Sequence, residues 1–414
     1  MRKASATAPL ASLLAGVQGA APQDQTLIIW HSWQNEELVV LDQWIKGYTS
    51  RNPEARIETE FIPRNDLDAR FEEAAPIGQG PDLVIGPPEW LASWALGGLI
   101  RPLDDALPNA LSEQVNRVAW KAVTLNSTIY AVPASGTALA LYYNRNLLSR
   151  PPAGFDAMLA AAEHVAETSH IGLIFDMSLQ WTVGYLHALG GALMDASGDP
   201  TVSDQAGREW LSLLAEAQER SQRTNAIVID YRNTKFCQGL AAMIIDGPWN
   251  LETYRVALGN NLGVAPLPRI EGQRPAPWVR TENFYVNAAA SRQRLAAVLD
   301  FLTLVTSGEG QVVAASLAGH VPVNADTPLD DPLLRVFLEQ AAEGVSFPNR
   351  PELEAYWVPM QNAIRAVTKE SASPASALET ATDAITARVA EIRATAQIPP
   401  TNESSFPFTL QNRT

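Results

Sequence analysis

The first hundred residues alternate short apolar runs with amphipathic segments, and this alternation constrains the fold more than any other feature. Apolar runs at residues 26–30, 56–62 and 82–85 are each followed by apolar residues at helical spacing. A β-α-β-α-β-α order is typical of a mostly parallel sheet covered by helices. We therefore predict an α/β fold for this part of the chain.

The pattern changes after Pro108. A helix to about Trp120 and a hairpin-like break at Asn126 are predicted first. A second αβ region follows, with strands predicted at residues 138–143, 171–175, 241–245, 262–265 and 278–287. The rest is predicted to be helical, at residues 292–307, 308–318, 328–340, 352–367 and 376–394. Because 414 residues exceed one ordinary core, we predict two domains.

Charge and cysteine content exclude several function classes. A formal net charge of -15 argues against binding nucleic acid or anionic membranes. The single cysteine, Cys237, rules out an intrachain disulfide and a cysteine metal cage. The five histidines lack metal-ligand spacing, and the phosphate-loop, dinucleotide, serine-hydrolase and zinc-hydrolase motifs are missing. We therefore predict no metal and no cofactor.

The N-terminus has the features of an export signal. Arg2 and Lys3 precede a short apolar stretch at residues 8–17, and small residues follow at 19–21. We predict a signal peptide at residues 1–23 and export to the periplasm or the extracellular face of the membrane. Residues 13–17 resemble a lipoprotein box without its cysteine, so no lipid anchor is predicted. At the other end, residues 397–414 are predicted to be a solvated tail.

Tryptophans occur repeatedly where predicted strands give way to helices. The strand at residues 241–245 ends at Asp246-Gly247, and Pro248 suits the first position of a new helix. This places Trp249 just past the carboxyl end of a strand, where ligands bind in open α/β sheets. Similar positions are held by Trp33, Trp90, Trp181, Trp278 and Trp357. An indole can stack on the apolar face of a sugar ring, although each tryptophan singly also suits a core position.

Several ordered motifs resemble one known family. They are Leu27-Ile-Ile-Trp30-His-Ser-Trp33; Gly80-Pro-Asp82 leading to Glu89-Trp90; Leu141-Tyr-Tyr143-Asn144; Phe236-x-x-Gly239-x-x-Ala242-Met243 leading to Gly247-Pro248-Trp249; Ser307-Gly-Glu309-Gly310; and Tyr356-Trp357. Together, over residues 26–396, they resemble the extracellular solute-binding proteins of carbohydrate ABC importers, of the maltose/maltodextrin-binding type.

The resemblance implies a specific architecture. It is a two-lobe periplasmic-binding-protein fold (Venus flytrap, type II-like) with hinge strands and C-terminal helices. The first lobe is expected to comprise residues 24–136 and 284–328. The second is expected to comprise residues 137–283 and 329–396.

The resemblance also implies a function: a monomeric, non-enzymatic receptor that binds a sugar between the lobes and delivers it to permease subunits. Glu89 matches a carboxylate that binds sugar hydroxyls, and Trp249 and Trp357 match aromatic platforms. The first polar loop is matched by Ser32 and Gln34 around Trp33. Gln180 and Ser178 stand where the family has a tyrosine and an acid, so a sugar is implied without specifying maltodextrin.

Two alternatives remain open. The same fold can carry a non-sugar solute such as a polyol, a glycerophosphodiester or a peptide. A glycoside-active enzyme would instead use two carboxylates, such as Glu89 and Asp246, at separations of about 5–5.5 Å or 6.5–9.5 Å.

Overall fold

The computed structural model describes residues 26–224, 227–228 and 232–396. The predicted signal peptide at residues 1–23 and the predicted tail at residues 397–414 lie outside the described residues. Within the described residues, no helix combines the length and apolar character needed to cross a membrane.

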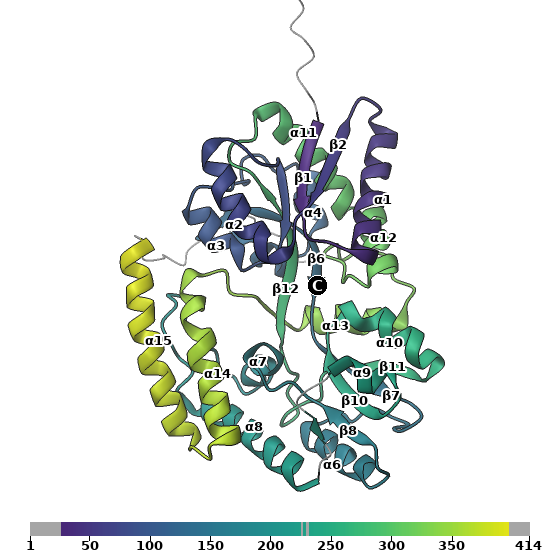
Figure 1. Cartoon of the computed structure of the whole chain (residues 1–414), viewed down its shortest axis with the longest axis vertical. Helices are drawn as coiled ribbons and strands as arrows, with labels where there is room; N and C mark the ends of the chain where they lie inside the picture. The colour runs from purple at the N-terminus through teal and green to yellow at the C-terminus, as the bar shows by residue number, and fades with distance from the viewer. Residues whose placement is uncertain (1–25, 225–226, 229–231, 397–414) are drawn as a thin grey trace, which may run out of the picture.

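Two sheets form the two halves of the molecule, one above the other in Figure 1. The first half is built on the sheet ordered β13 (Val345–Ser346), β12 (Trp278–Val286), β3 (Leu83–Gly86), β1 (Thr26–His31) and β2 (Arg56–Phe61), with β6 (Ala131–Thr137) paired to β12. The second half is built on β11 (Leu262–Ala265), β7 (Ala140–Asn144), β10 (Ala241–Asp246), β8 (Ile171–Ile174) and β9 (Ile227–Val228). A small hairpin of β4 (Thr124–Leu125) and β5 (Thr128–Ile129) completes the strands. The predicted α/β class is confirmed.

Helices cover both sheets. The first half carries α1 (Asn35–Arg51), α2 (Arg64–Ala74), α3 (Trp90–Leu96), α4 (Asn109–Gln114), α5 (Arg117–Lys121), α11 (Arg292–Thr306) and α12 (Gly308–Ala318). The second half carries α6 (Phe155–Ala166), α7 (Leu179–Ala188), α8 (Gln205–Thr224), α9 (Arg232–Cys237), α10 (Leu251–Leu258), α13 (Pro332–Ala342), α14 (Glu354–Lys369) and α15 (Pro374–Ala396). Short 3-10 turns occur at η1 (Ala75–Ile77), η2 (Pro248–Asn250), η3 (Gly259–Asn261) and η4 (Pro351–Leu353). The helices α14 and α15 lie side by side along the second half (Figure 1).

Strands β6 and β12 run between the two halves (Figure 1). The carboxyl-terminal part of β12 pairs antiparallel with β3 and β6, inside the first sheet. Its first residue, Trp278, is buried in the core of the second half. Strand β6 likewise ends at Thr137, and β7 of the second sheet begins at Ala140. The division of the chain into lobes at the residues expected above stays a prediction.

Hydrophobic packing gives each half its own core. In the first half, Trp44, Trp94 and Phe301 are buried together. In the second half, both faces of the sheet are covered, so successive residues of β7 enter different cores: Leu141 packs on one face and Tyr142 on the other. This explains why its strands read as unbroken apolar runs.

Three predicted elements differ from the structure. The helix expected to reach Trp120 is broken into α4 and α5, because the side chain of Asn116 accepts a hydrogen bond from the backbone N–H of Ala119 and caps a new helix. The helix expected at residues 328–340 begins only at Pro332, capped by Asp331. Pro248 opens a 3-10 turn, and α10 starts three residues later.

The side chain of Gln311 in α12 ties three backbone segments together. It is 1% exposed, donates to the carbonyl oxygens of Ala134 (2.8 Å) and Val305 (3.0 Å), and accepts from the N–H of Val323 (2.8 Å). Gln311→Met leaves these buried groups unpaired, at roughly 1–3 kcal/mol for each group that finds no new partner. We expect the free energy of unfolding in urea to fall by at least about 2 kcal/mol.

The matched control is Gln361→Met, on the exposed face of α14. Its stability should stay within about 0.5 kcal/mol of the wild type. Equal losses in the two variants would contradict the structural role given to Gln311.

Candidate functional site

Most predicted site residues lie in loops at the carboxyl ends of parallel strands. Strands β1 and β3 are parallel neighbours in the first sheet, as β8 and β10 are in the second. The loops after these four strands cover residues 32–34, 87–89, 175–178 and 247 onward. Each pair of loops therefore meets at one edge of its sheet, the edge at which open α/β sheets bind ligands.

Arg280 of β12 connects these two edges. Its guanidinium forms an ion pair with Glu89, in the loop after β3 of the first half. It also donates to the Oε1 atom of Gln180 (3.2 Å), at the start of α7 in the second half. The guanidinium carbon lies 5.0 Å from the ring centre of Phe347. One side chain of β12 thus contacts a loop of the first half and the start of a helix of the second.

Trp249 presents its indole at the edge of the second sheet. It is 46% exposed, although tryptophan is usually among the more buried residues. The indole folds back over Gly247, where a Cβ atom would lie 2.1 Å from the ring. The turn is fixed from below, because Tyr142 donates to the carbonyl oxygen of Gly247 (2.7 Å) and Asp246 accepts from its N–H (2.8 Å). Trp181 meets Trp249 edge to face, with ring centres 6.4 Å apart.

A second aromatic group lies beside Arg280. Trp357 of α14 is half-buried, and its ring stacks at 6.4 Å on Phe347. Trp278 is only 4% exposed and meets Phe347 and Trp357 edge to face at 5.2 Å and 5.7 Å. Trp278 therefore supports the other two rings from inside the core.

The remaining predicted residues belong to the first half. Trp33 is 2% exposed and packs between Trp44 and His320, with ring centres 5.7 Å and 5.4 Å away. Trp90 is half-buried, and its ring lies 4.9 Å from that of the core residue Trp94. Ser32 is half-buried and Gln34 is exposed. The structure thus places Glu89 against Arg280, and it places Trp278 and Trp357 around Phe347, which packs on Arg280. Trp181 follows Gln180 in the sequence and contacts Trp249. Trp33 and Trp90 pack in the first core.

Glu282 adds a second ion pair on the same strand. It lies two residues beyond Arg280 and faces Arg64 of α2 at 3.5 Å. Burial raises the pKa of Glu282 above the ordinary glutamate value, and the negative charge of Glu37 adds to the rise. The positive charges of Arg64 and Arg280 act in the opposite direction, as does His320.

Sequence reasoning did not single out Arg280, Glu282 or Phe347. The signal for the first two was present: an arginine and a glutamate at alternate positions of the strand at residues 278–287 place both charges on one face. Phe347 had no comparable signal, because it follows a short strand that pairs only with β12.

The carboxylate pair considered for glycoside hydrolysis is not set up as a catalytic pair. Asp246 is 2% exposed and accepts hydrogen bonds from Asn250 (2.8 Å) and Tyr254 (2.6 Å), while Glu89 is paired with Arg280. Among the described residues, no group of three or more His, Cys, Asp or Glu side chains could hold a metal ion.

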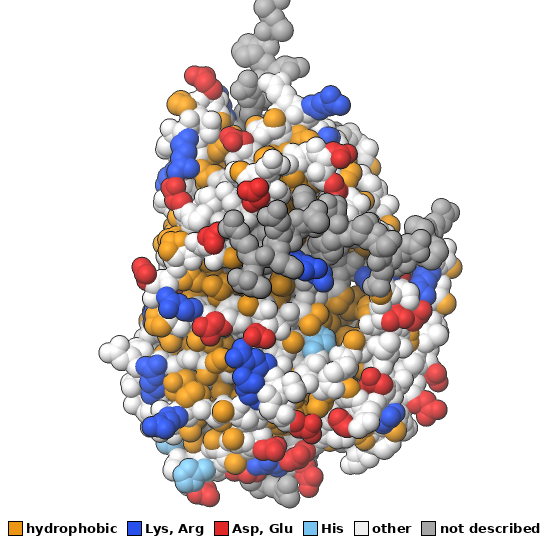
Figure 2. Space-filling view, turned by 180° about the vertical axis from the view of Figure 1, so that it is seen from behind, with side chains coloured by type: hydrophobic (Ala, Val, Ile, Leu, Met, Phe, Trp, Pro, Cys, Tyr) orange, Lys and Arg blue, Asp and Glu red, His pale blue; other side chains and the backbone are white. Residues whose placement is uncertain are grey.

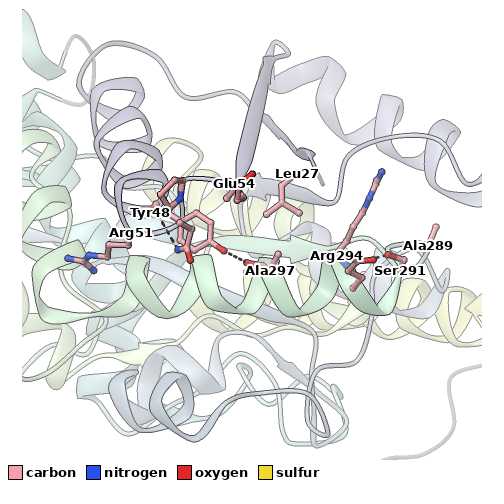
Figure 3. Close-up of a pocket in the computed structure, with 12 residues that line it drawn as sticks. Leu27, Tyr48, Arg51, Glu54, Ala289, Ser291, Arg294 and Ala297 are labelled. Carbon is pink, nitrogen blue, oxygen red and sulfur yellow. Dashed lines mark hydrogen bonds between the residues drawn. The ribbon is translucent and has the colours of Figure 1, made fainter. Parts of the chain in front are cut away.

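A cavity of about 700 Å³ lies elsewhere, between the C-terminal end of α1 and the N-terminal end of α11. Figure 3 shows Tyr48 beside Ala297, to whose carbonyl oxygen it donates a hydrogen bond, with Arg51 at one end of the cavity and Ser291 and Arg294 at the other. Leu27, at the amino end of β1, also lines it. Since the predicted site residues follow the carboxyl ends of the strands, this cavity is separate from the site.

On the face seen in Figure 2, Lys and Arg side chains are interspersed with Asp and Glu over both halves. The described residues of this face therefore carry no continuous basic stripe of the kind that binds nucleic acid.

Comparisons with known proteins agree on one family. The family model of bacterial extracellular solute-binding proteins matches residues 43–335. The maltotriose-binding protein of Pyrococcus abyssi is 26% identical over 358 residues, covering 83% of this chain and 78% of that protein. The galactooligosaccharide-binding protein of Bacillus subtilis is 23% identical, covering 74% of this chain and 77% of that protein.

Solved structures share the fold. The cyclic alpha-maltosyl-1,6-maltose binding protein of Arthrobacter globiformis superposes with a TM-score of 0.79 at 20% identity, covering 88% of this chain and 99% of that one. The two-lobe α/β fold predicted from the sequence motifs is confirmed by this similarity.

Glu282→Gln tests the electrostatics of the site. Because the folded protein raises the pKa of Glu282, the native state binds this proton more tightly than the unfolded state. The stability contributed by the protonated form is present below the ordinary glutamate pKa and is lost as pH rises through the raised value. The melting temperature of the variant relative to wild type should therefore increase between pH 4 and pH 7.

The control is Glu343→Gln, which removes an exposed carboxylate paired with Arg274 in the second half. The raised pKa of Glu282 would be contradicted if the melting temperature of Glu282→Gln relative to wild type did not change with pH. A rise no larger than that of the control would contradict it as well.

Proposed function

The chain belongs to the bacterial extracellular solute-binding proteins, and from this premise we propose that it is the substrate-binding component of an ABC importer for a sugar or oligosaccharide. It receives the sugar between its two halves and delivers it to the permease subunits. The family is one of exported binding proteins. Within it, we propose a monomer at the periplasmic or outer face of the membrane.

The observation that carries the proposal is the 46% exposed indole of Trp249 against Trp181, whose neighbour in the sequence, Gln180, contacts Arg280. The apolar face of a sugar ring can stack on this indole, and the edge of Trp181 closes one side of the platform. Hydroxyl groups need nearby donors and acceptors, and Glu89, Arg280 and Gln180 supply both. Apolar lining with a few placed polar groups is typical of small-molecule sites.

We propose that the ligand contacts Trp249, Trp181, Trp357 and Glu89, with Ser32 and Gln34 contributing from the first half. Trp33, Trp90 and Trp278 act as packing residues beneath this surface, because each lies against core aromatic rings. Relatives with maltotriose- and galactooligosaccharide-binding names support an oligosaccharide as the cargo.

The pairing of charges favours sugars over phosphate-bearing solutes. Arg280 and Arg64 are already paired with Glu89 and Glu282. A glycerophosphodiester would have to displace one of these carboxylates, whereas a neutral hydroxyl group can bind beside them. The two lobes would close over the sugar about β6 and β12, by the hinge motion that many binding proteins use.

Trp249→Ala tests the platform. In isothermal calorimetry against maltotriose, galactotriose and their shorter homologues, the wild type should bind at least one sugar with a dissociation constant below about 1 mM. Trp249→Ala should weaken that sugar by at least about 30-fold, since an aromatic anchor contributes about 2 kcal/mol or more. The melting temperature without sugar should change little, because the side chain is 46% exposed.

Val256→Ala on α10 is the matched control, as its side chain is 79% exposed. It should bind the same sugar as tightly as wild type. A wild type that binds none of the sugars would overturn the proposed function, and equal affinity in both variants would remove Trp249 from the site.

A further inference from the structure

The Arg280–Glu89 ion pair joins strand β12 to the loop after β3, and Arg280 also contacts Gln180 of the second half. Arg280 lies two residues after the core residue Trp278, and its side chain is 20% exposed. Glu89 precedes α3 in the first half, and its side chain is 34% exposed. Although Glu89 holds the N-cap position of α3, its side chain makes no capping hydrogen bond. Its carboxylate instead faces Arg280, which packs on Phe347.

The guanidinium of Arg280 is the more firmly held member of the pair. Phe347 lies against it at 5.0 Å, and Gln180 accepts one of its N–H groups at 3.2 Å. Both contacts leave the positive charge in place if Glu89 loses its own charge. The charge balance at this point of the site therefore depends on Glu89.

The neighbouring carboxylates also have partners. Glu282, on the same strand, faces Arg64 of α2 at 3.5 Å. Farther along, Glu37 of α1 contacts His320 at 3.3 Å. Because Arg64 is occupied by Glu282, it does not compensate a change at Glu89 or Arg280.

We propose that Arg280 and Glu89 act together as a selectivity filter for the net charge of the sugar. This inference rests on the proposed function. Glu89 accepts a hydrogen bond from one ligand hydroxyl, and Arg280 donates to a neighbouring hydroxyl oxygen. Each residue cancels the charge of the other, so the pair offers no net charge to compensate a charged sugar. A uronic acid or a protonated amino sugar therefore loses hydration without gaining a free partner, whereas an uncharged sugar binds. Arg280 is thus a specificity-determining residue.

The test removes one charge of the pair at a time and measures how the preference between neutral and charged sugars changes. The probes are maltotriose or galactotriose, whichever the wild type binds, with analogues that carry a C6 carboxylate or a 2-amino group at either end. At 0.1 M salt the Debye length is about 10 Å, so a charge on the bound sugar interacts with the pair. The wild type should prefer the neutral sugar over both charged analogues.

Glu89→Gln should shift the ratio of affinities, carboxylate analogue over neutral sugar, upward by at least about 10-fold. Arg280→Gln should shift the corresponding ratio for the amino analogue upward by a similar factor. The double variant should return both ratios toward the wild-type values. High salt should reduce the shifts, because they are electrostatic.

Arg274→Gln and Glu343→Gln are the matched controls, since they break an ion pair of the second half and change the net charge identically. Each folded variant is verified by its melting temperature, and Arg280→Lys retains the charge if Arg280→Gln does not fold. Ratios unchanged in both charge-removal variants, or shifted equally in the controls, overturn the filter while the proposed function stands. A wild type that binds none of the sugars overturns both the filter and the proposed function.

Discussion

Strand β12 is the element on which the rest of the structure depends. Its carboxyl-terminal part pairs with β3 and β6 in the first sheet, and Trp278 at its start is buried in the second core. A strand shared in this way fixes how the halves face each other. It also carries Arg280 and Glu282 to the boundary on one face, because side chains two residues apart point the same way. The same strand therefore packs the two halves together and positions the polar groups between them.

Two turns have a similar local structure, but the tryptophan in one is packed in a core and the tryptophan in the other is exposed. In both the Gly86–Trp90 and Gly247–Trp249 turns, an indole folds over a glycine at or just after the end of a strand, so close that a Cβ atom would lie within 2.3 Å of the ring. Trp90 then packs at 4.9 Å on Trp94, in the first core. Trp249 has the edge of Trp181 as its aromatic neighbour and remains 46% exposed. The neighbours in space decide which indole is available.

The sequence predicted the local elements but not which tryptophans are exposed. Period and turn residues predicted most strands and long helices, since those signals are local: the helix expected at residues 308–318 is α12. Exposure of a tryptophan is set by residues far along the chain, such as His320 against Trp33, so no local pattern separates Trp33 from Trp249. The contact of Arg280 with Glu89 spans separate elements and needed the folded chain.

The ion pair between Arg280 and Glu89 is weak compared with the free energy that a sugar gains on an aromatic surface. Both side chains are partly exposed, and ion pairs near a surface contribute roughly 0 to 1 kcal/mol. A sugar that covers about 100 Å² of apolar surface on the exposed indole of Trp249 gains about 2.5 kcal/mol from that burial alone. Burial of the aromatic surface therefore contributes more free energy to binding than the ion pair contributes to stability. The polar pair contributes mainly to discrimination between neutral and charged sugars. The free energy lost when a charge is left unpaired in a partly buried site is larger than the free energy gained from a matched pair.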